Sequence, residues 1–154
     1  MVQEQFKLSA FVCLFLRKNN MLLLIRRCKT GSGDGFYSCA GGKVDGDEPM
    51  THAMIREARE ELGIKLKRKN LKMVHVLHHP KGQHGDQESV GFFMEATDWE
   101  GEPQNMEPHK HDAIGWFLLN ELPLNTHPRL KHVIEMVNSN VFYSEDGWTL
   151  DRVE

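Results

Sequence analysis

The sequence predicts a single α+β domain, residues 1–154, in which groups of strands alternate with single helices. Three observations support this fold class. The length of 154 residues suits one hydrophobic core and leaves little room for a second. Several short apolar runs are bounded by turn residues, which is typical of strands. Two longer segments repeat their apolar residues at helical spacing. The predicted order is therefore strands, helix, strands, helix.

The first predicted elements are two strands that form a hairpin. One apolar run covers about residues 6–16 and the next covers about residues 21–27, with the turn residues Lys-Asn-Asn at 18–20 between them. The segment CKTGSGDG then predicts a loop by its glycines and polar residues. After it, FYSCA predicts a third strand that ends at the Gly41-Gly42 pair.

A helix is predicted between Pro49 and Gly63. Proline is favoured in the first turn because its missing N–H is not needed there, and glycine is favoured just past a helix end. Steps of 100° place one set of residues along a single stripe, namely Thr51, Ile55, Ala58 and Leu62. A second set falls on nearly the opposite side, namely Glu57, Glu60 and Glu61. The helix is therefore expected to pack by one face and present carboxylates from the other.

Further strands and a second helix complete the predicted fold. LKMVHVLHH and ESVGFFMEATDW are expected to pair as antiparallel strands around the polar loop PKGQHGDQ, and AIGWFLL predicts one more strand. The second helix is predicted from about Pro128 to Asn138, where four apolar residues recur at helical spacing: Leu130, Val133, Ile134 and Val137.

Composition excludes several classes of protein. The net charge of −3 and the pI near 6.3 argue against broad electrostatic binding of a nucleic acid polymer, so a small anionic ligand would need local cations. No apolar run approaches the roughly 20 residues of a membrane helix, and the start lacks the pattern of a signal peptide, so a cytoplasmic location without membrane contact is expected. Cys13, Cys28 and Cys39 show no metal-binding spacing and are expected to be reduced packing residues.

The segment REAREELGI crowds three glutamates onto one helical turn. One interpretation is a solvated surface on which Arg56 and Arg59 partly balance the charge. The other is a site for a divalent metal ion, because hard cations such as Mg²⁺ prefer carboxylate oxygens and convert repulsion among them into shared attraction. The helix alone does not decide between them.

Residues 42–64, GKVDGDEPMTHAMIREAREELGI, resemble the Nudix box. Every glycine and charged position of that pattern is filled, and Ala58 stands where a larger aliphatic residue is also common. The resemblance implies the Nudix fold over roughly residues 6–138, an α/β/α sandwich with a mixed sheet between helices, and a hydrolase acting on phosphorus-containing anhydrides. One departure is Cys39-Ala40, where relatives commonly carry proline before the two glycines, and it is expected to loosen the turn.

The resemblance also implies a cofactor and roles for particular residues. WEGEPQNME is similar to a segment of bacterial MutT proteins that precedes a metal-binding glutamate, here Glu107; a solvated glutamate in a turn is the alternative. Arg56 cannot act as a base at neutral pH and is expected to hold Glu57 or Glu48 by a charge-assisted hydrogen bond, with Glu57 as the favoured general base and Glu48 as its orienting partner. Mg²⁺, or Mn²⁺, would be bound by the Gly41 carbonyl, Glu57, Glu60, Glu61 and Glu107.

MutT-like relatives hydrolyse nucleoside triphosphates, including oxidised guanine nucleotides, to a monophosphate and pyrophosphate, which makes this the expected reaction. Arg26, Arg27 and Lys43 are candidates for phosphate contact, although solvated cations are an equal interpretation. Asn125 lies within one position of a base-reading asparagine of that group. Pro80 lies at a spacing from the box that resembles members hydrolysing ADP-ribose, so an ADP-ribose or nucleotide-sugar pyrophosphatase is the second hypothesis. A non-catalytic nucleotide sensor is a third, but it would be expected to lack some box glutamates.

Two features allow more than one interpretation. Four histidines, His75, His78, His79 and His84, lack the compact spacing of a zinc site, although one of them near the substrate could carry a proton. The C-terminal segment VFYSEDGWTL could cover a partner or the domain's own edge, so a monomer and a homodimer are both compatible with the sequence.

Overall fold

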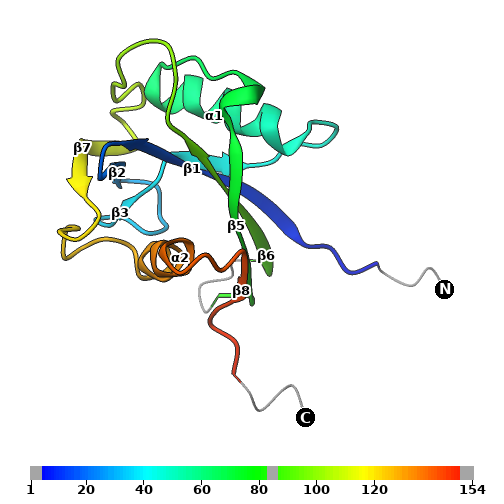
Figure 1. Cartoon of the computed structure of the whole chain (residues 1–154). Helices are drawn as coiled ribbons and strands as arrows, with labels where there is room; N and C mark the ends of the chain where they lie inside the picture. Colours follow the sequence, from blue (N-terminus) through cyan, green and yellow to red (C-terminus); the bar gives the residue numbers. More distant parts are fainter. Residues whose placement is uncertain (1–4, 83–86, 150–154) are drawn as a thin grey trace.

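A computed structural model describes residues 5–82 and 87–149. It has the three predicted layers: α1 covers one face of a mixed sheet and α2 covers the other (Figure 1). The strands are β1 (Ser9–Lys18), β2 (Met21–Arg27), β3 (Tyr37–Ser38), β4 (Gly41–Lys43), β5 (Lys72–His79), β6 (Ser89–Ala96), β7 (His111–Leu118) and β8 (Tyr143–Glu145). The helices are α1 (Met50–Leu62) and α2 (Pro128–Asn138), with a 3₁₀ turn at Arg68–Asn70.

The sheet is mixed because β1 pairs in parallel with β6 and antiparallel with β2 and β4. Strand order is β3-β2-β1-β6-β5-β8, with β4 also pairing with β1 and β7 with β2. The predicted hairpins are confirmed: β1 turns into β2 through two residues, and β5 pairs antiparallel with β6. The predicted strand FYSCA is confirmed only at Tyr37–Ser38, and the Gly41-Gly42 pair that was expected to end it belongs to a further strand, β4, opposite β1.

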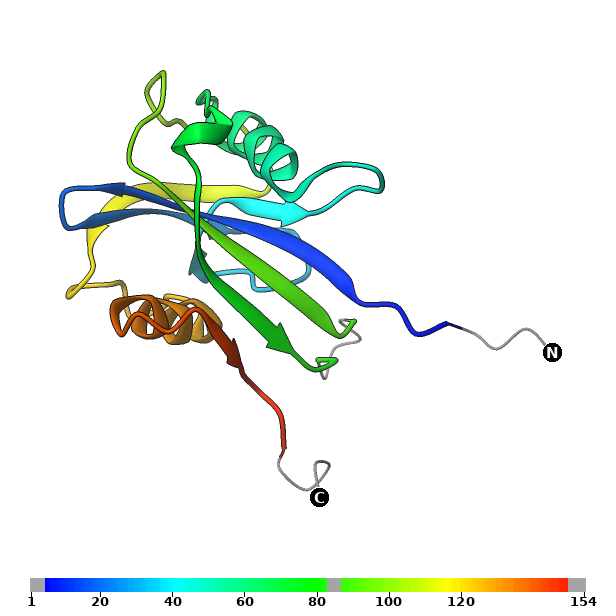
Figure 2. The same ribbon diagram turned by 45° about the vertical axis from the view of Figure 1, so that its right-hand side comes forward.

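Helices α1 and α2 lie on opposite sides of the sheet (Figure 2). Two hydrophobic clusters occupy the two faces of the sheet. Alternation along β1 and β2 separates them, since side chains of successive strand residues point to opposite faces. Leu14, Leu23 and Ile25 pack with α1, whereas Phe15 and Leu24 pack with α2. The sheet is therefore apolar on both sides along its central strands, as a layer between two helices must be.

Helix α1 has the predicted bounds but not the predicted buried face. Pro49 precedes it, and Gly63 ends it with φ 69°, a left-handed conformation that glycine adopts readily. Its fully buried apolar side chains are Ala53, Met54, Ala58 and Leu62. The predicted stripe is thus correct at Ala58 and Leu62, whereas Thr51 and Ile55 are only half-buried. The helix is rotated relative to the prediction, which brings part of its acidic side toward the sheet.

The C-terminal segment covers the edge of the domain's own sheet. Strand β8 pairs in parallel with β5, and the buried His75 bonds to it: Nδ1 lies 2.8 Å from the Val141 carbonyl oxygen and Nε2 lies 2.8 Å from Ser144 Oγ. Phe142 and Tyr143 remain exposed at this edge. His84 lies outside the described residues. Among the described helices, none has the length and apolar character needed to cross a membrane.

Candidate active site

An acidic cavity of about 520 Å³ lies between α1, β4 and the loop that leads into β7. We call it the acidic cavity after the four carboxylates that line it: Glu57, Glu60, Glu61 and Glu107. All four were expected to bind metal, and the structure brings all four to one cavity. Gly41, the fifth expected ligand, lies in its wall together with Gly42.

The two glycines of β4 allow α1 to approach the sheet with its acidic side. The Gly41 N–H donates to Glu61 Oε2 at 2.7 Å, and a methyl group at Gly42 would collide with the Glu57 carboxylate. Glu61 is consequently only 7% exposed. The expectation that all three helix glutamates face away from the packed side is therefore wrong for Glu57 and Glu61, and correct for the exposed Glu60.

Arg56 connects the loop before α1 to the acidic side of the helix. Its Nη2 donates to Glu48 Oε1 at 2.7 Å and its Nε donates to Glu48 Oε2 at 3.2 Å, while its Nη1 donates to Glu57 Oε1 at 2.7 Å. The predicted bonds to Glu48 and Glu57 are both present. Because a guanidinium group donates in a rigid planar fork, Arg56 holds the Glu57 carboxylate in one orientation toward the cavity.

Glu61 is the most strongly perturbed carboxyl group of the cavity. Burial raises its pKa to about 8, and the neighbouring charges of Glu57 and Glu107 act in the same direction, against the hydrogen bond from Gly41. Burial also raises the pKa of Glu57, although the bond from Arg56 opposes the shift. Without a bound cation, these carboxylates are thus poorly stabilised in their charged form.

A stability measurement checks this electrostatic arrangement. The folded-state pKa of Glu61 lies above its unfolded value, so its stabilising effect is complete below about pH 4.5 and is lost as pH rises through about 8. We expect metal-free wild-type protein to lose up to about 1.4 kcal/mol of stability per pH unit in this window relative to Glu61→Gln. Urea titrations at pH 5 and pH 8 measure the difference, and parallel pH curves for the two proteins would contradict it.

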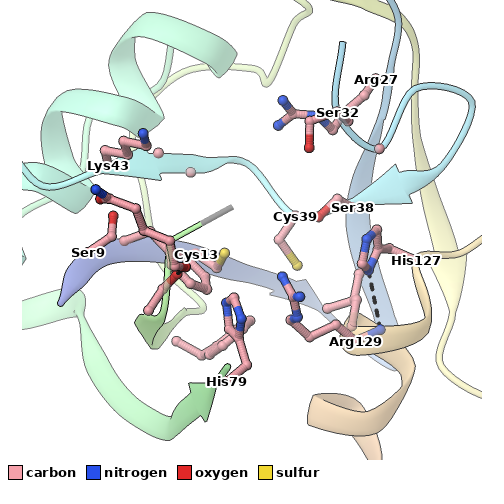
Figure 3. Close-up of a pocket in the computed structure, with 18 residues that line it drawn as sticks. Ser9, Cys13, Arg27, Ser32, Ser38, Cys39, Lys43, His79, His127 and Arg129 are labelled. Carbon is pink, nitrogen blue, oxygen red and sulfur yellow. Dashed lines mark hydrogen bonds between the residues drawn. The ribbon is translucent and has the colours of Figure 1, made fainter. Parts of the chain in front are cut away.

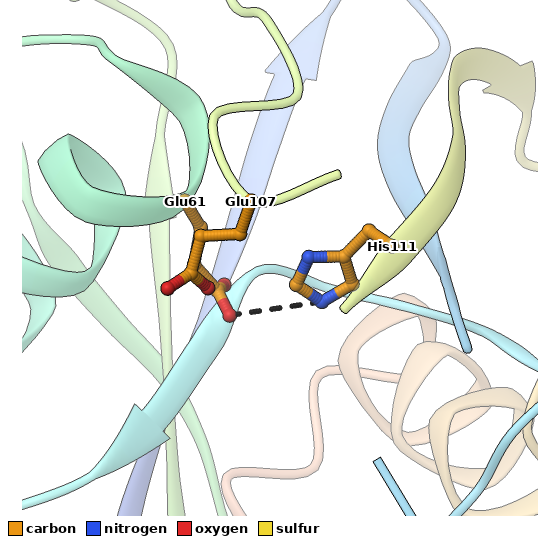
Figure 4. Close-up of side chains that lie close together, drawn as sticks. All are labelled: Glu61, Glu107 and His111. Carbon is orange, nitrogen blue, oxygen red and sulfur yellow. Dashed lines mark ion pairs between the residues drawn. The ribbon is translucent and has the colours of Figure 1, made fainter. Parts of the chain in front are cut away.

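His111 is a residue of the site that the sequence analysis missed. It is the first residue of β7, it is 2% exposed, and it lies with Glu61 and Glu107 so that one potential ligand atom of each is within 4.8 Å of the others (Figure 4). Burial lowers the pKa of His111, so its imidazole is held neutral. A signal was present in the sequence, since His111 follows Glu107 by four residues in one short loop.

The residues of the acidic cavity fit a divalent cation. Carboxylate oxygens and a neutral imidazole nitrogen are both ligands of such ions in proteins. Nδ1 of His111 is buried and has no hydrogen-bond partner among the described residues, so the cavity contains a donor atom that the surrounding protein does not satisfy. The space that a Cβ at Gly42 would fill is occupied by the Glu57 carboxylate.

A second cavity, of about 510 Å³, adjoins the acidic one. We call it the aromatic cavity after the rings that line it: Phe11, His79, Phe93 and His127. Figure 3 shows Arg129 of α2 and His79 of β5 on one side of it, with Arg27 and Lys43 toward β2 and β4. No aspartate or glutamate is among its described lining residues.

The two cavities have three lining residues in common: Arg27, Gly41 and Gly42. Arg27 is held in place by the loop after β2, because its Nε donates to the Ser32 carbonyl at 2.8 Å and its Nη2 donates to Thr30 Oγ1 at 3.2 Å. The two cavities therefore meet at a fixed guanidinium group and a strand of glycines.

The structure separates the four predicted substrate-binding residues. Arg27 and Lys43 line the aromatic cavity, and Arg27 also lines the acidic cavity. Arg26 and Asn125 line neither of these cavities: Arg26 lies over the Tyr37 ring and pairs with Asp112 at 2.6 Å, and Asn125 donates to the Gly35 carbonyl at 2.7 Å. The structure therefore gives no support to Arg26 and Asn125 as ligand contacts.

Among the predicted histidine candidates, His79 reaches a cavity, whereas His75 is bonded to the C-terminal segment and His78 to Glu88. All three cysteines are free, as expected, and Cys13 and Cys39 line the aromatic cavity.

Comparisons with solved structures support one family. The crystal structure of a MutT NUDIX hydrolase from Burkholderia pseudomallei is 32% identical in sequence, with a TM-score of 0.77 over 84% of this chain and 98% of that chain. The Mutator MutT protein from Bacillus halodurans is 23% identical, with a TM-score of 0.73 over 94% of this chain and 92% of that one, and shares the fold.

Two curated relatives match over shorter segments. CTP pyrophosphohydrolase of Escherichia coli (strain K12) is 38% identical over 58 residues, which are 38% of this chain and 43% of that protein. The uncharacterized Nudix hydrolase YvcI of Bacillus subtilis (strain 168) is 27% identical over 107 residues, 70% of this chain and 64% of that protein. This chain thus spans less than two thirds of both. Because the family model of the NUDIX domain matches residues 6–137, this chain belongs to the Nudix family.

Proposed function

We propose that this protein hydrolyses a nucleoside triphosphate to a nucleoside monophosphate and pyrophosphate in a Mg²⁺- or Mn²⁺-dependent reaction. The observation that carries the proposal is the wall common to the two cavities, made of Arg27, Gly41 and Gly42. A nucleoside would occupy the aromatic cavity, whose size and aromatic lining suit a small organic ligand. Its phosphates would then pass Arg27 and the glycine strand into the acidic cavity.

The acidic cavity supports a role for a divalent ion. Nudix hydrolases generally use one, and Glu61 and Glu107 offer carboxylate oxygens that lie close together. When bound, such an ion neutralises phosphate oxygens and lowers the pKa of a water molecule. The exposed Glu60 and the Gly41 carbonyl are further ligands in this proposal. Because Glu61 has a raised pKa in the metal-free site, binding of the ion would release a proton.

Glu57 is the proposed general base. Its carboxylate lies in the acidic cavity, its pKa is raised by burial, and Arg56 fixes its direction. A carboxylate that is more basic than an ordinary glutamate accepts a proton from water more effectively near neutral pH. The water oxygen would form the new bond to phosphorus, the anhydride P–O bond would break, and pyrophosphate would leave with the electron pair. Glu48 acts only through Arg56.

A product assay tests the proposal. We would incubate the protein and Glu60→Gln with Mg²⁺ or Mn²⁺ and a panel of nucleoside triphosphates, oxidised guanine nucleotides, ADP-ribose and nucleotide sugars. Release of pyrophosphate and a monophosphate, reduced in the variant, is the expected result, and the panel would identify the base. CTP belongs in the panel because of the named activity of the E. coli relative.

Other outcomes of the assay would overturn the proposal. Turnover of ADP-ribose or nucleotide sugars alone would replace it with the second hypothesis, although Pro80, the residue behind that hypothesis, lines neither of the two cavities. Binding of a triphosphate in calorimetry without turnover would replace it with a sensor. The intact set of box glutamates supports an enzyme over a sensor.

A further inference from the structure

We infer that His111 is a direct nitrogen ligand of the divalent ion in the acidic cavity, beside Glu61 and Glu107. The site would then favour ions that accept imidazole as well as carboxylate. This inference rests on the metal dependence proposed above and deepens it, because it adds a ligand that lies outside the Nudix box and the glutamate motif, and it states a class of preferred ion.

The first support is proximity. One ligand atom each of Glu61, Glu107 and His111 lies within 4.8 Å of the other two, and Nε2 of His111 is 3.8 Å from Glu61 Oε1. Atoms that share an ion through bonds of about 2.1 Å lie at most about 4.2 Å apart. The three side chains are thus near the separation that one ion requires. The distance of 3.8 Å is also too long for a hydrogen bond between them.

The second support is an unsatisfied buried nitrogen. His111 is 2% exposed, and its Nδ1 has no hydrogen-bond partner in residues 5–82 and 87–149. A buried polar atom without a partner is destabilising by about 1–3 kcal/mol. A ligand role explains the cost, because the arrangement that leaves Nδ1 without a partner keeps the other ring nitrogen, Nε2, 3.8 Å from Glu61 Oε1 in the wall of the acidic cavity.

A β-bulge in β7 determines the direction of the His111 side chain. Arg26 lies opposite Ala113, but the next pair along β2 is Arg27 opposite His111, so Asp112 is an extra residue in β7. In a regular register Asp112 would lie opposite Arg27. The bulge puts His111 there instead and leaves Asp112 to pair with Arg26. Bulges change the direction of individual side chains and are common beside active sites.

Hydrogen bonds within the loop before the bulge hold Glu107 and His111 next to each other. Oδ1 of Asn105 accepts from the Glu107 N–H at 3.2 Å, and Nδ2 of Asn105 donates to the His111 carbonyl at 2.7 Å. The His111 N–H in turn donates to the Glu107 carbonyl at 3.0 Å. Both side chains therefore leave one compact turn on the same side, which fixes them before any ion binds.

A nitrogen ligand changes which ion the site prefers. Mg²⁺ is a hard ion that favours oxygen and readily keeps water in its coordination shell, so loss of an imidazole ligand costs it little. Co²⁺ binds imidazole well and lies higher than Mn²⁺ in the general order of affinity. His111 should therefore increase affinity for Co²⁺ much more than for Mg²⁺.

Calorimetric titration with each metal salt alone tests this difference. We expect His111→Gln to weaken Co²⁺ binding at least about tenfold, because even the partners of metal ligands typically contribute tenfold or more. Mg²⁺ binding should change much less. The matched control is His109→Gln, which removes an exposed histidine from the wall of the same cavity and should leave both affinities unchanged. Equal losses for Co²⁺ and Mg²⁺ in His111→Gln would overturn the inference.

A second measurement needs no substitution at His111. Pulsed EPR of the Mn²⁺-loaded wild-type protein should detect coupling to a directly bound ¹⁴N nucleus, which is replaced by ¹⁵N coupling when histidine is labelled. His109→Gln should keep the signal. Mn²⁺ binding without nitrogen coupling would overturn the inference alone and leave the proposed function standing. If no divalent ion binds the wild-type protein, the metal dependence under Proposed function fails as well.

Discussion

Replacing Glu57 with glutamine is expected to lower kcat by about 10²–10⁴-fold, the usual contribution of a general base. Glutamine keeps the shape of the side chain and can still accept from Arg56 Nη1, which donates to Glu57 at 2.7 Å in the wild-type protein. KM should change little, because the substitution removes proton transfer rather than binding. Steady-state kinetics on the substrate identified by the screen measures the effect.

The control for this substitution is Glu121→Gln, which neutralises an exposed glutamate after β7 and should have wild-type kinetics. The pH profile adds a second check. The decrease in kcat at low pH, which protonation of Glu57 causes in the wild-type protein, should be absent from Glu57→Gln. If Glu57→Gln retained more than a tenth of wild-type kcat, the base would have to be another carboxylate of the acidic cavity.

Arg56→Lys is expected to lower both stability and activity. Lysine has no planar fork, so it cannot donate to Glu48 and Glu57 at once as Arg56 does. Hydrogen bonds to charged groups contribute about 1.5–3 kcal/mol each, so a loss of about 2 kcal/mol is expected. For a domain of this size that corresponds to a decrease in Tm of about 4–8 °C. Because the Glu57 carboxylate also loses its orientation, kcat should fall more than tenfold.

Arg59→Lys is the matched control, because Arg59 is an exposed residue of the same helix. Thermal unfolding and kinetics should be close to wild type in this variant. A Tm for Arg56→Lys that equals the Tm of Arg59→Lys would show that the bonds of Arg56 to Glu48 and Glu57 do not stabilise the fold.

The bounds of both helices could be predicted because their signals are local. Pro49 and Gly63 flank α1, and the apolar spacing of Leu130, Val133 and Ile134 marks α2, each within a few residues of chain. The carboxylates were found because the box pattern is local as well. The lengths of β3 and β4 could not be predicted in this way, since pairing with β2 and β1 determines them.

The direction of particular side chains depended on distant parts of the chain. Helical periodicity predicted that Glu61 faces solvent, because it lies nearly opposite the apolar stripe. In the structure the Gly41 N–H donates to Glu61, and the lack of a side chain at Gly42 leaves room for the Glu57 carboxylate against the sheet. His111 was missed because the apolar pattern of its strand begins only at Ala113, and a bulge leaves no mark in the sequence.

The central sheet has α1 on one face and α2 on the other. This arrangement allows the residues that select the substrate to evolve separately from the residues that hydrolyse it. Under the proposed function, hydrolysis depends on α1 and the turn before β7, whereas the nucleoside contacts come largely from β1, β6 and the start of α2. A substitution at Phe93 or Arg129 can change the accepted base without moving Glu57. Members of one family can thus acquire new substrates by mutation on one side of the sheet while inheriting an unchanged reaction on the other.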